Sequence, residues 1–93
     1  MKQRYNVTIS YKIVLATNTR EGKLISQIKR TSGVPHTTLY EYLPHLTRQK
    51  LVQKLEQPNK HSRYKITTKG IHFLLAFEKT LCFLKDTKNI NTT

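Results

Sequence analysis

The apolar residues of this chain change their spacing twice along the sequence, and this change constrains the fold more than any other feature. Up to Leu46 they recur at helical spacing, between Leu51 and Ile66 they alternate, and from Ile71 onward helical spacing returns. Helical spacing places apolar side chains on one face of an α-helix, whereas alternation is typical of a strand. The sequence therefore predicts helices, then a pair of strands, then a last helix.

Two helices are predicted in the first third of the chain. The first covers residues 9–16, with Thr8 or Ser10 as its N-cap, and it ends in the polar stretch NTREG. The second covers residues 23–32, KLISQIKRTS, and carries Lys and Arg in its last turn, where positive charge suits the helix dipole. Gly33 follows it, and a residue without a Cβ fits a left-handed turn.

A third helix is predicted over residues 36–46, HTTLYEYLPHL, although it contains Pro44. Proline has no N–H to donate, and its ring presses on the carbonyl of the residue four positions earlier, which is Tyr40. Because Pro44 lies opposite the apolar stripe, we expect one helix that bends between Tyr40 and Pro44. The residues expected to face the core are Leu39, Tyr42, Leu43 and Leu46.

A hairpin and a long helix complete the predicted domain. Strands are expected at residues 51–56, with Leu51, Gln53 and Leu55 alternating, and at residues 63–67, with the basic loop QPNKHS between them. The last helix is expected to begin at Thr68, capped by Thr67 or Thr68. The chain then divides into a domain with a basic N-terminal lead-in (residues 1–67), a long helix (68–86) and a disordered tail (87–93).

The last helix carries apolar residues on nearly all sides, which leaves two interpretations. It either folds back on its own domain as core, or it reaches out and pairs with a second copy of the chain. We favour a two-fold dimer, because the apolar surface exceeds what one small domain covers. The residues predicted at the dimer interface are Ile71, Leu74, Leu75, Phe77, Leu81 and Leu84.

The charge of the chain points to a polyanionic partner. Lys and Arg number 17 against 5 Asp and Glu, which gives a formal net charge of +12. Nucleic acid is the first expectation and an acidic membrane surface the second. No stretch reaches the length of apolar residues that a membrane span needs, and the N-terminus has no apolar signal-peptide core. We therefore expect a cytoplasmic, nucleoid-associated protein.

The sequence offers no constellation for catalysis. The acidic residues are scattered, the glycines are not grouped, and Cys82 lies within an apolar helix. The four histidines show no metal-ligand spacing with this cysteine. We expect no enzyme activity, no catalytic residue, no metal, no cofactor and no small-molecule ligand.

Three stretches carry a resemblance to a known family: TSGVPHTTLYEYLPHL, LTRQKLVQKL and RYKITTKG. Together they resemble small archaeal winged helix-turn-helix DNA-binding proteins, with the MarR-like and PadR-like regulators as wider relatives. The resemblance implies a mainly α fold with a small β-hairpin, in the order helix-helix-helix-strand-strand-long helix. It also implies dimerisation through an antiparallel coiled coil of the last helix. Lys50 stands where the family usually has glycine, which implies a non-glycine residue in the left-handed conformation.

The resemblance implies a dimeric transcription regulator that binds double-stranded DNA, with the third helix in the major groove. Glu41 either accepts from a cytosine amine or lies off the interface. Two alternatives remain: a protein-interaction module that uses the last helix, and a chromatin-type protein without sequence preference. The residues expected to contact DNA from the recognition helix are His36, Thr37, Thr38, Tyr40, Glu41, His45 and Arg48, and those from the wing are Lys60, His61 and Arg63. The residues expected to contact the DNA backbone alongside are Lys23, Lys29 and Arg30.

Overall fold

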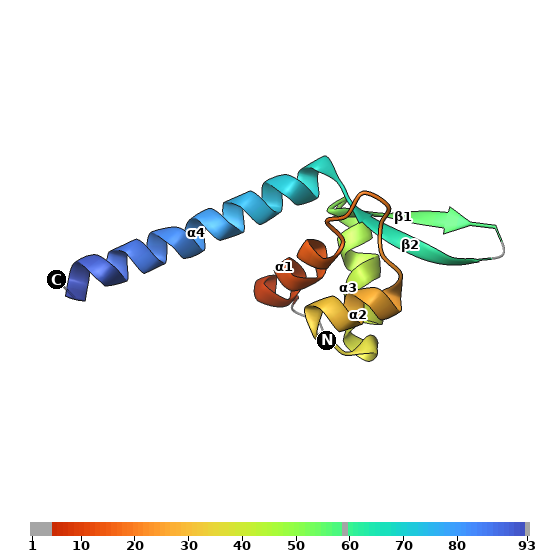
Figure 1. Ribbon diagram of the computed structural model, residues 1–93, viewed down its shortest axis with the longest axis horizontal. Helices are drawn as coiled ribbons and strands as arrows, with labels where there is room; N and C mark the ends of the chain where they lie inside the picture. Colours follow the sequence, from red (N-terminus) through yellow and green to blue (C-terminus); the bar gives the residue numbers. More distant parts are fainter. Residues whose placement is uncertain (1–4, 59, 93) are drawn as a thin grey trace.

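The computed structural model describes the backbone of residues 5–58 and 60–92 and the side chains of this part up to Leu81. Three helices form the body, the hairpin extends from one side of it, and the last helix extends from the other (Figure 1). This order and arrangement is that of a winged helix, as the sequence predicted. The elements are α1 (Val7–Ala16), α2 (Ile25–Ser32), α3 (His36–Arg48), β1 (Val52–Gln57), β2 (Lys60–Ile66) and α4 (Thr68–Thr92).

Helix α1 begins earlier than the sequence analysis expected, because its N-cap is Asn6. The Asn6 Oδ1 accepts from the backbone N–H of Thr8 at 2.7 Å and of Ile9 at 3.1 Å. These bonds satisfy two of the donors that a helix start leaves free. The expected caps were wrong: Thr8 lies in the first turn, and Ser10 is buried inside the helix.

Helix α2 begins at Ile25 rather than at Lys23, because the backbone of Lys23 is paired with a strand. Lys23 and Tyr64 of β2 exchange N–H···O bonds of 2.8 Å in both directions. This short pairing ties the loop before α2 to the hairpin. At the other end, Gly33 adopts φ 76°, which confirms the left-handed turn.

Helix α3 is a single helix that includes Pro44, as predicted. The Pro44 ring is exposed, opposite the buried face of the helix. The bend between Tyr40 and Pro44 stays a prediction. All four residues predicted for the core face are buried: Leu39, Tyr42, Leu43 and Leu46.

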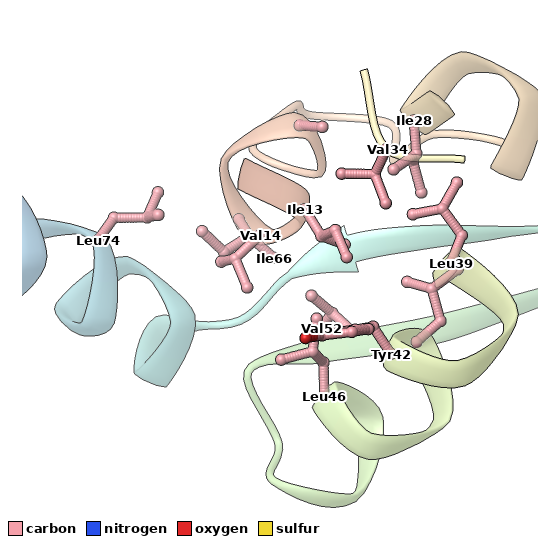
Figure 2. Packing of buried hydrophobic residues seen from close by; sticks show 12 residues of the cluster. Ile13, Val14, Ile28, Val34, Leu39, Tyr42, Leu46, Val52, Ile66 and Leu74 are labelled. Atoms are coloured by element: carbon pink, nitrogen blue, oxygen red, sulfur yellow. The ribbon is translucent and has the colours of Figure 1, made fainter. Parts of the chain in front are cut away.

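The core lies where the helical body meets the base of the hairpin. Ile13, Ile28 and Leu39 are completely buried, and they come from the three body helices. Val52 and Ile66 extend the cluster into the hairpin, and Leu74 adds a contribution from α4 (Figure 2). All six elements therefore converge on one core, which fixes α3 against the hairpin.

The end of α3 confirms the conformation expected of Lys50. Its φ is 66°, the value that usually selects glycine. The Lys50 N–H donates to the Thr47 carbonyl at 2.9 Å, and the Leu51 N–H donates to the Leu46 carbonyl at 3.0 Å. These two bonds form a Schellman motif, which turns the chain into β1 at the cost of a strained lysine.

The strands of the hairpin extend closer to its tip than predicted. The two strands pair from Val52↔Ile66 to Gln57↔Lys60, with an irregularity between Leu55 and Gln57. Lys60 and His61 were expected in the loop, but they belong to β2, because the ladder continues past the irregularity. The buried residue of β1 is Val52, opposite the buried Ile66, whereas Gln53 is exposed. Further along this strand Leu55 is half-buried, and Lys54 and Glu56 are exposed.

Helix α4 begins as predicted and ends later. The Thr67 Oγ1 accepts from the Gly70 N–H at 3.0 Å, which caps the first turn. The helix continues to Thr92, past the expected end at Asp86. No proline or glycine, the residues that oppose helix propagation most strongly, follows Gly70 in the sequence.

The first half of α4 packs on α1. Leu74 is 4% exposed and belongs to the core, which corrects its expected place at a dimer interface. Phe77 is half-buried, and its ring stacks on Tyr11 with centroids 4.4 Å apart. The Tyr11 hydroxyl donates to the Glu78 carboxylate at 2.8 Å. One side of this helix is therefore core, while other apolar side chains remain exposed. Pairing with a second copy of the chain stays a prediction.

Candidate nucleic-acid interface

The outer face of α3 presents aromatic and polar side chains. Tyr40 is 63% exposed, and Thr37, Glu41 and Arg48 are exposed as well. His36 is half-buried, and its ring lies nearly parallel to that of Tyr40, with centroids 5.9 Å apart and 23° between the planes. Tyr40 and its polar neighbours therefore form the solvent-facing side of α3, opposite its core residues.

A cavity of about 480 Å³ lies between α3 and the hairpin, and we call it the α3–hairpin cavity. His36 and Tyr40 line it from α3, and Lys54, His61 and Tyr64 line it from the hairpin. Leu24, Ile25 and Leu43 supply apolar lining beside them. The cavity therefore combines apolar and aromatic surface with a lysine and two imidazoles.

The structure brings together three predicted residues here and adds two that sequence reasoning missed. His36, Tyr40 and His61 come from the predicted recognition helix and wing. Lys54 and Tyr64 are paired with each other across the strands of the hairpin. Lys54 was missed, because nothing local in the sequence indicates that this exposed lysine borders a cavity next to α3.

Two predicted DNA-contacting residues are engaged within the chain. The ring of His45 stacks on Tyr5 at a centroid distance of 3.7 Å. The Arg63 Nη1 donates to the Gly22 carbonyl at 3.1 Å. The side chains of His45 and Arg63 are both half-buried. The stack and the hydrogen bond hold elements of the domain together. Lys60 is exposed on β2, and Thr38 is half-buried on α3.

Basic residues also surround the loop between α1 and α2. Arg20, Lys23 and Arg63 line a second, open hollow together with the acidic Glu21 and with Thr19, Gly22 and Gln27. Arg20 was missed, because the stretch NTREG was interpreted only as a helix end. Lys29 and Arg30 are exposed in the last turn of α2. These cations broaden the positive surface beyond α3 and the hairpin.

Among the side chains that the structure describes, in residues 5–58 and 60–81, no group of three His, Cys, Asp or Glu is placed to hold a metal ion. Every helix within residues 5–58 and 60–92 is too short or too polar to span a bilayer.

Comparison with solved structures identifies the fold. Sso10a-2, a DNA-binding protein from Sulfolobus solfataricus, superposes with a TM-score of 0.75 at 19% identity, covering 96% of this chain and 90% of that one. MepR, a transcription regulator of the Staphylococcus aureus multidrug efflux pump MepA, also gives 0.75 at 20% identity, over 92% of this chain and 64% of that one.

The S. aureus MepR–DNA complex gives a TM-score of 0.69 at 19% identity, over 95% of this chain and 73% of that one. No family model and no curated protein matches the sequence. At these identities the likeness establishes the winged-helix fold.

Proposed function

We propose that this protein binds double-stranded DNA as a dimeric winged-helix transcription regulator. The observation that carries the proposal is the single surface on which the outer face of α3 and the basic hairpin meet around the α3–hairpin cavity. On a chain of net charge +12, such a surface attracts the phosphate backbone. The likeness to DNA-binding winged helices, one of them solved with DNA, supports the same conclusion.

In this proposal α3 enters the major groove with its N-terminal turns leading. Thr37 and Tyr40 are exposed there and donate to base edges or phosphates, with His36 and Thr38 beside them. Arg48 is exposed at the opposite end of α3 and meets a phosphate. Glu41 lies between these ends, where it accepts from a cytosine amine or stays off the interface.

The hairpin and the α1–α2 loop contact the DNA backbone. Lys60 and His61 are exposed on β2 and lie near phosphates on one flank of α3. Lys23, Lys29 and Arg30 contribute positive charge from α2 and the loop before it. His45 and Arg63 act mainly by holding this surface in shape, since both already have partners within the chain. A protein with this role acts in the cytoplasm, on the nucleoid.

Dimerisation would use the apolar surface that α1 and α4 leave exposed. Leu75 is 58% exposed, Leu81 45% and Ile71 41%, all on α4. Val7 and Leu15 of α1 are also exposed. One chain leaves these side chains in water, and a second copy related by a two-fold axis would cover them. Leu84, also predicted there, lies outside the residues whose side chains are described.

A salt titration tests DNA binding. If about six phosphates are neutralised per dimer, log K falls with log salt at a slope of about −5. Fluorescence anisotropy of a labelled duplex at several salt concentrations measures the slope. Lys60→Ala should lower affinity for every duplex alike and make the slope shallower. Absence of binding at low salt, or an affinity independent of salt, contradicts the proposal.

Sequence preference is tested separately by selection from a random duplex pool. A regulator enriches a defined motif, because its base contacts discriminate between sequences. Recovery of a pool without any motif contradicts regulation of specific genes and favours a chromatin-type role.

A further inference from the structure

We propose that the α3–hairpin cavity receives a single unpaired nucleobase, so that the protein prefers duplexes with an extruded or bulged nucleotide over fully paired ones. The inference rests on the proposed DNA binding and adds a ligand to its surface. Three features of the α3–hairpin cavity support the inference: its size, its aromatic lining and its basic residue Lys54.

The size and lining of the cavity suit a small planar group. Its volume of about 480 Å³ falls in the range of pockets that hold small organic ligands. Leu24 and Ile25 are half-buried and provide an apolar surface that a fully stacked duplex cannot cover, because its base faces are hidden within the stack. A base that leaves the stack brings the apolar face that this lining matches.

Aromatic rings stand where such a base would stack. Tyr40 is 63% exposed and lies nearly parallel to His36, and both rings line the cavity. Tyr64 lines it from the hairpin. Base–aromatic stacking tolerates any sequence, because every base has a π-face, and single-strand binding proteins rely on it. An exposed tyrosine next to a histidine is therefore a platform for an unstacked base.

The charge at the cavity matches the phosphates of the same nucleotide. Lys54 and His61 lie on its hairpin side, and the lining contains no acidic residue. A nucleotide extruded between α3 and the hairpin would place its base on the apolar side and its phosphates near the Lys54 ammonium, with the His61 imidazole beside it. The complementarity thus covers both halves of a nucleotide.

The test compares labelled duplexes of one sequence: fully paired, with one bulged nucleotide, and with an abasic bulge. The wild-type chain should bind the base-containing bulge about fivefold or more tightly than either of the others, the gain expected of one stacked base. An abasic bulge keeps the flexible backbone and lacks the base, so equal affinity for both bulges overturns the proposal.

Protein variants assign the preference to the cavity. Tyr40→Ala should abolish it, and Tyr40→Phe should keep it, because the ring remains. Arg48→Ala, outside the cavity lining, should weaken all three duplexes alike. Circular dichroism checks that each variant is folded. A preference that survives Tyr40→Ala in a folded protein overturns the proposal.

Photo-crosslinking locates the base directly. A 5-iodouracil at the bulge should crosslink to His36, Tyr40 or Tyr64, as mapped by mass spectrometry of the peptides. Crosslinks to residues outside the cavity overturn the inference. If all duplexes bind equally well, this inference fails and DNA binding stands, whereas absence of binding to any duplex refutes both.

Discussion

The ring of Tyr5 lies flat on the ring of His45, with centroids 3.7 Å apart and 2° between the planes. Tyr5 also meets Tyr42 edge-on, with centroids 5.1 Å apart. Next to it, the Asn6 N–H donates to the Tyr42 hydroxyl at 2.8 Å. The segment that leads into α1 is thus held on the C-terminal half of α3.

We expect Tyr5→Ala to lower the free energy of unfolding by the hydrophobic free energy of the lost burial and by about 1 kcal/mol more, because aromatic pairs contribute on this order in addition to burial. Urea denaturation measures it, and a double-mutant cycle with His45→Ala isolates the pair. Tyr5→Phe is the control, since it keeps the ring. A coupling energy near zero would show that the stack does not stabilise the fold.

The same stack predicts an order of effects on DNA binding. His45 has one ring face covered by Tyr5, whereas Arg48, one turn further along α3, is exposed. Arg48→Ala should therefore reduce affinity for duplex DNA more than His45→Ala, as measured by anisotropy with folded variants at one salt concentration. The reverse order would mean that His45 contacts DNA directly.

The Tyr11–Glu78 bond predicts a dependence of stability on alkaline pH. The hydrogen bond to Glu78 raises the pKa of the Tyr11 hydroxyl, with burial and the negative charge of Glu78 adding to the effect. The folded state therefore holds this proton more tightly than the unfolded state. The stabilisation is fully present below about pH 10, the ordinary tyrosine value, and is lost as pH rises through the raised pKa.

Tyr11→Phe isolates this contribution, because it keeps the ring that stacks on Phe77 and removes the hydroxyl. Urea unfolding at neutral pH should show the variant less stable than wild type by up to about 1 kcal/mol. The difference should shrink as pH rises above about 10. A difference that stays constant over this range would contradict the assignment.

The surroundings of Gly70 predict that its substitution by alanine destabilises the fold, whereas helix propensity alone predicts stabilisation. Alanine in a helix is normally about 1 kcal/mol more favourable than glycine. A Cβ at Gly70, however, would collide with the Leu51 carbonyl oxygen and approach Ile66 Cγ1 to 2.7 Å. Gly70→Ala should therefore destabilise the fold by about 2 kcal/mol, through overpacking where α4 leaves the hairpin.

Gly33→Ala provides the comparison, because a Cβ there meets nothing within 4 Å and suffers only from φ 76°. We expect a loss of about 1 kcal/mol for it, smaller than that of Gly70→Ala. Thermal or urea denaturation ranks the two. A Gly70→Ala variant more stable than wild type would disprove the close approach.

Lys50 predicts a stabilising substitution. Its φ of 66° is unfavourable for any residue with a Cβ, and the Lys50 side chain is exposed. Lys50→Gly should raise the free energy of unfolding by about 0.5 kcal/mol, since relief of this strain exceeds the entropy that glycine adds to the unfolded chain. Gln49→Gly, at φ −77°, should instead destabilise. Equal effects at both positions would contradict the assignment to the left-handed conformation.

The sequence predicted best those structural features that are determined by residues close together in the chain. The core face of α3 and the turn at Gly33 follow from side-chain spacing or from the chemistry of one residue. The left-handed Lys50 was expected only from the family resemblance, in which glycine usually stands at this position. The partner of His45 is Tyr5, far away in sequence, and no local pattern indicates that pair. Side-chain spacing alone therefore assigned His45 to DNA.

The hairpin and α4 were predicted less well for the same reason. The face of β1 is set by the pairing of Val52 with Ile66, and alternation in a short strand does not distinguish one register from the next. Leu74 and Leu75 are adjacent apolar residues, and the packing of α1 decides that the first is core and the second exposed. The cavity lies between α3 and the hairpin, so the residues that line it from the hairpin depend on how the two strands pair.

The exposed apolar residues of α4 predict the oligomeric state. The wild-type chain should sediment as a dimer, and Leu75→Lys should weaken the dimer at least tenfold, because a two-fold interface loses the side chain on both copies and each is worth about 1.5–3 kcal/mol when buried. Thr80→Lys, also exposed on α4, is the matched control and should leave the dimer intact. Sedimentation velocity across a concentration series measures both. A wild-type monomer, or a Leu75→Lys variant that dimerises as well as Thr80→Lys, would show that this surface does not join two copies of the chain.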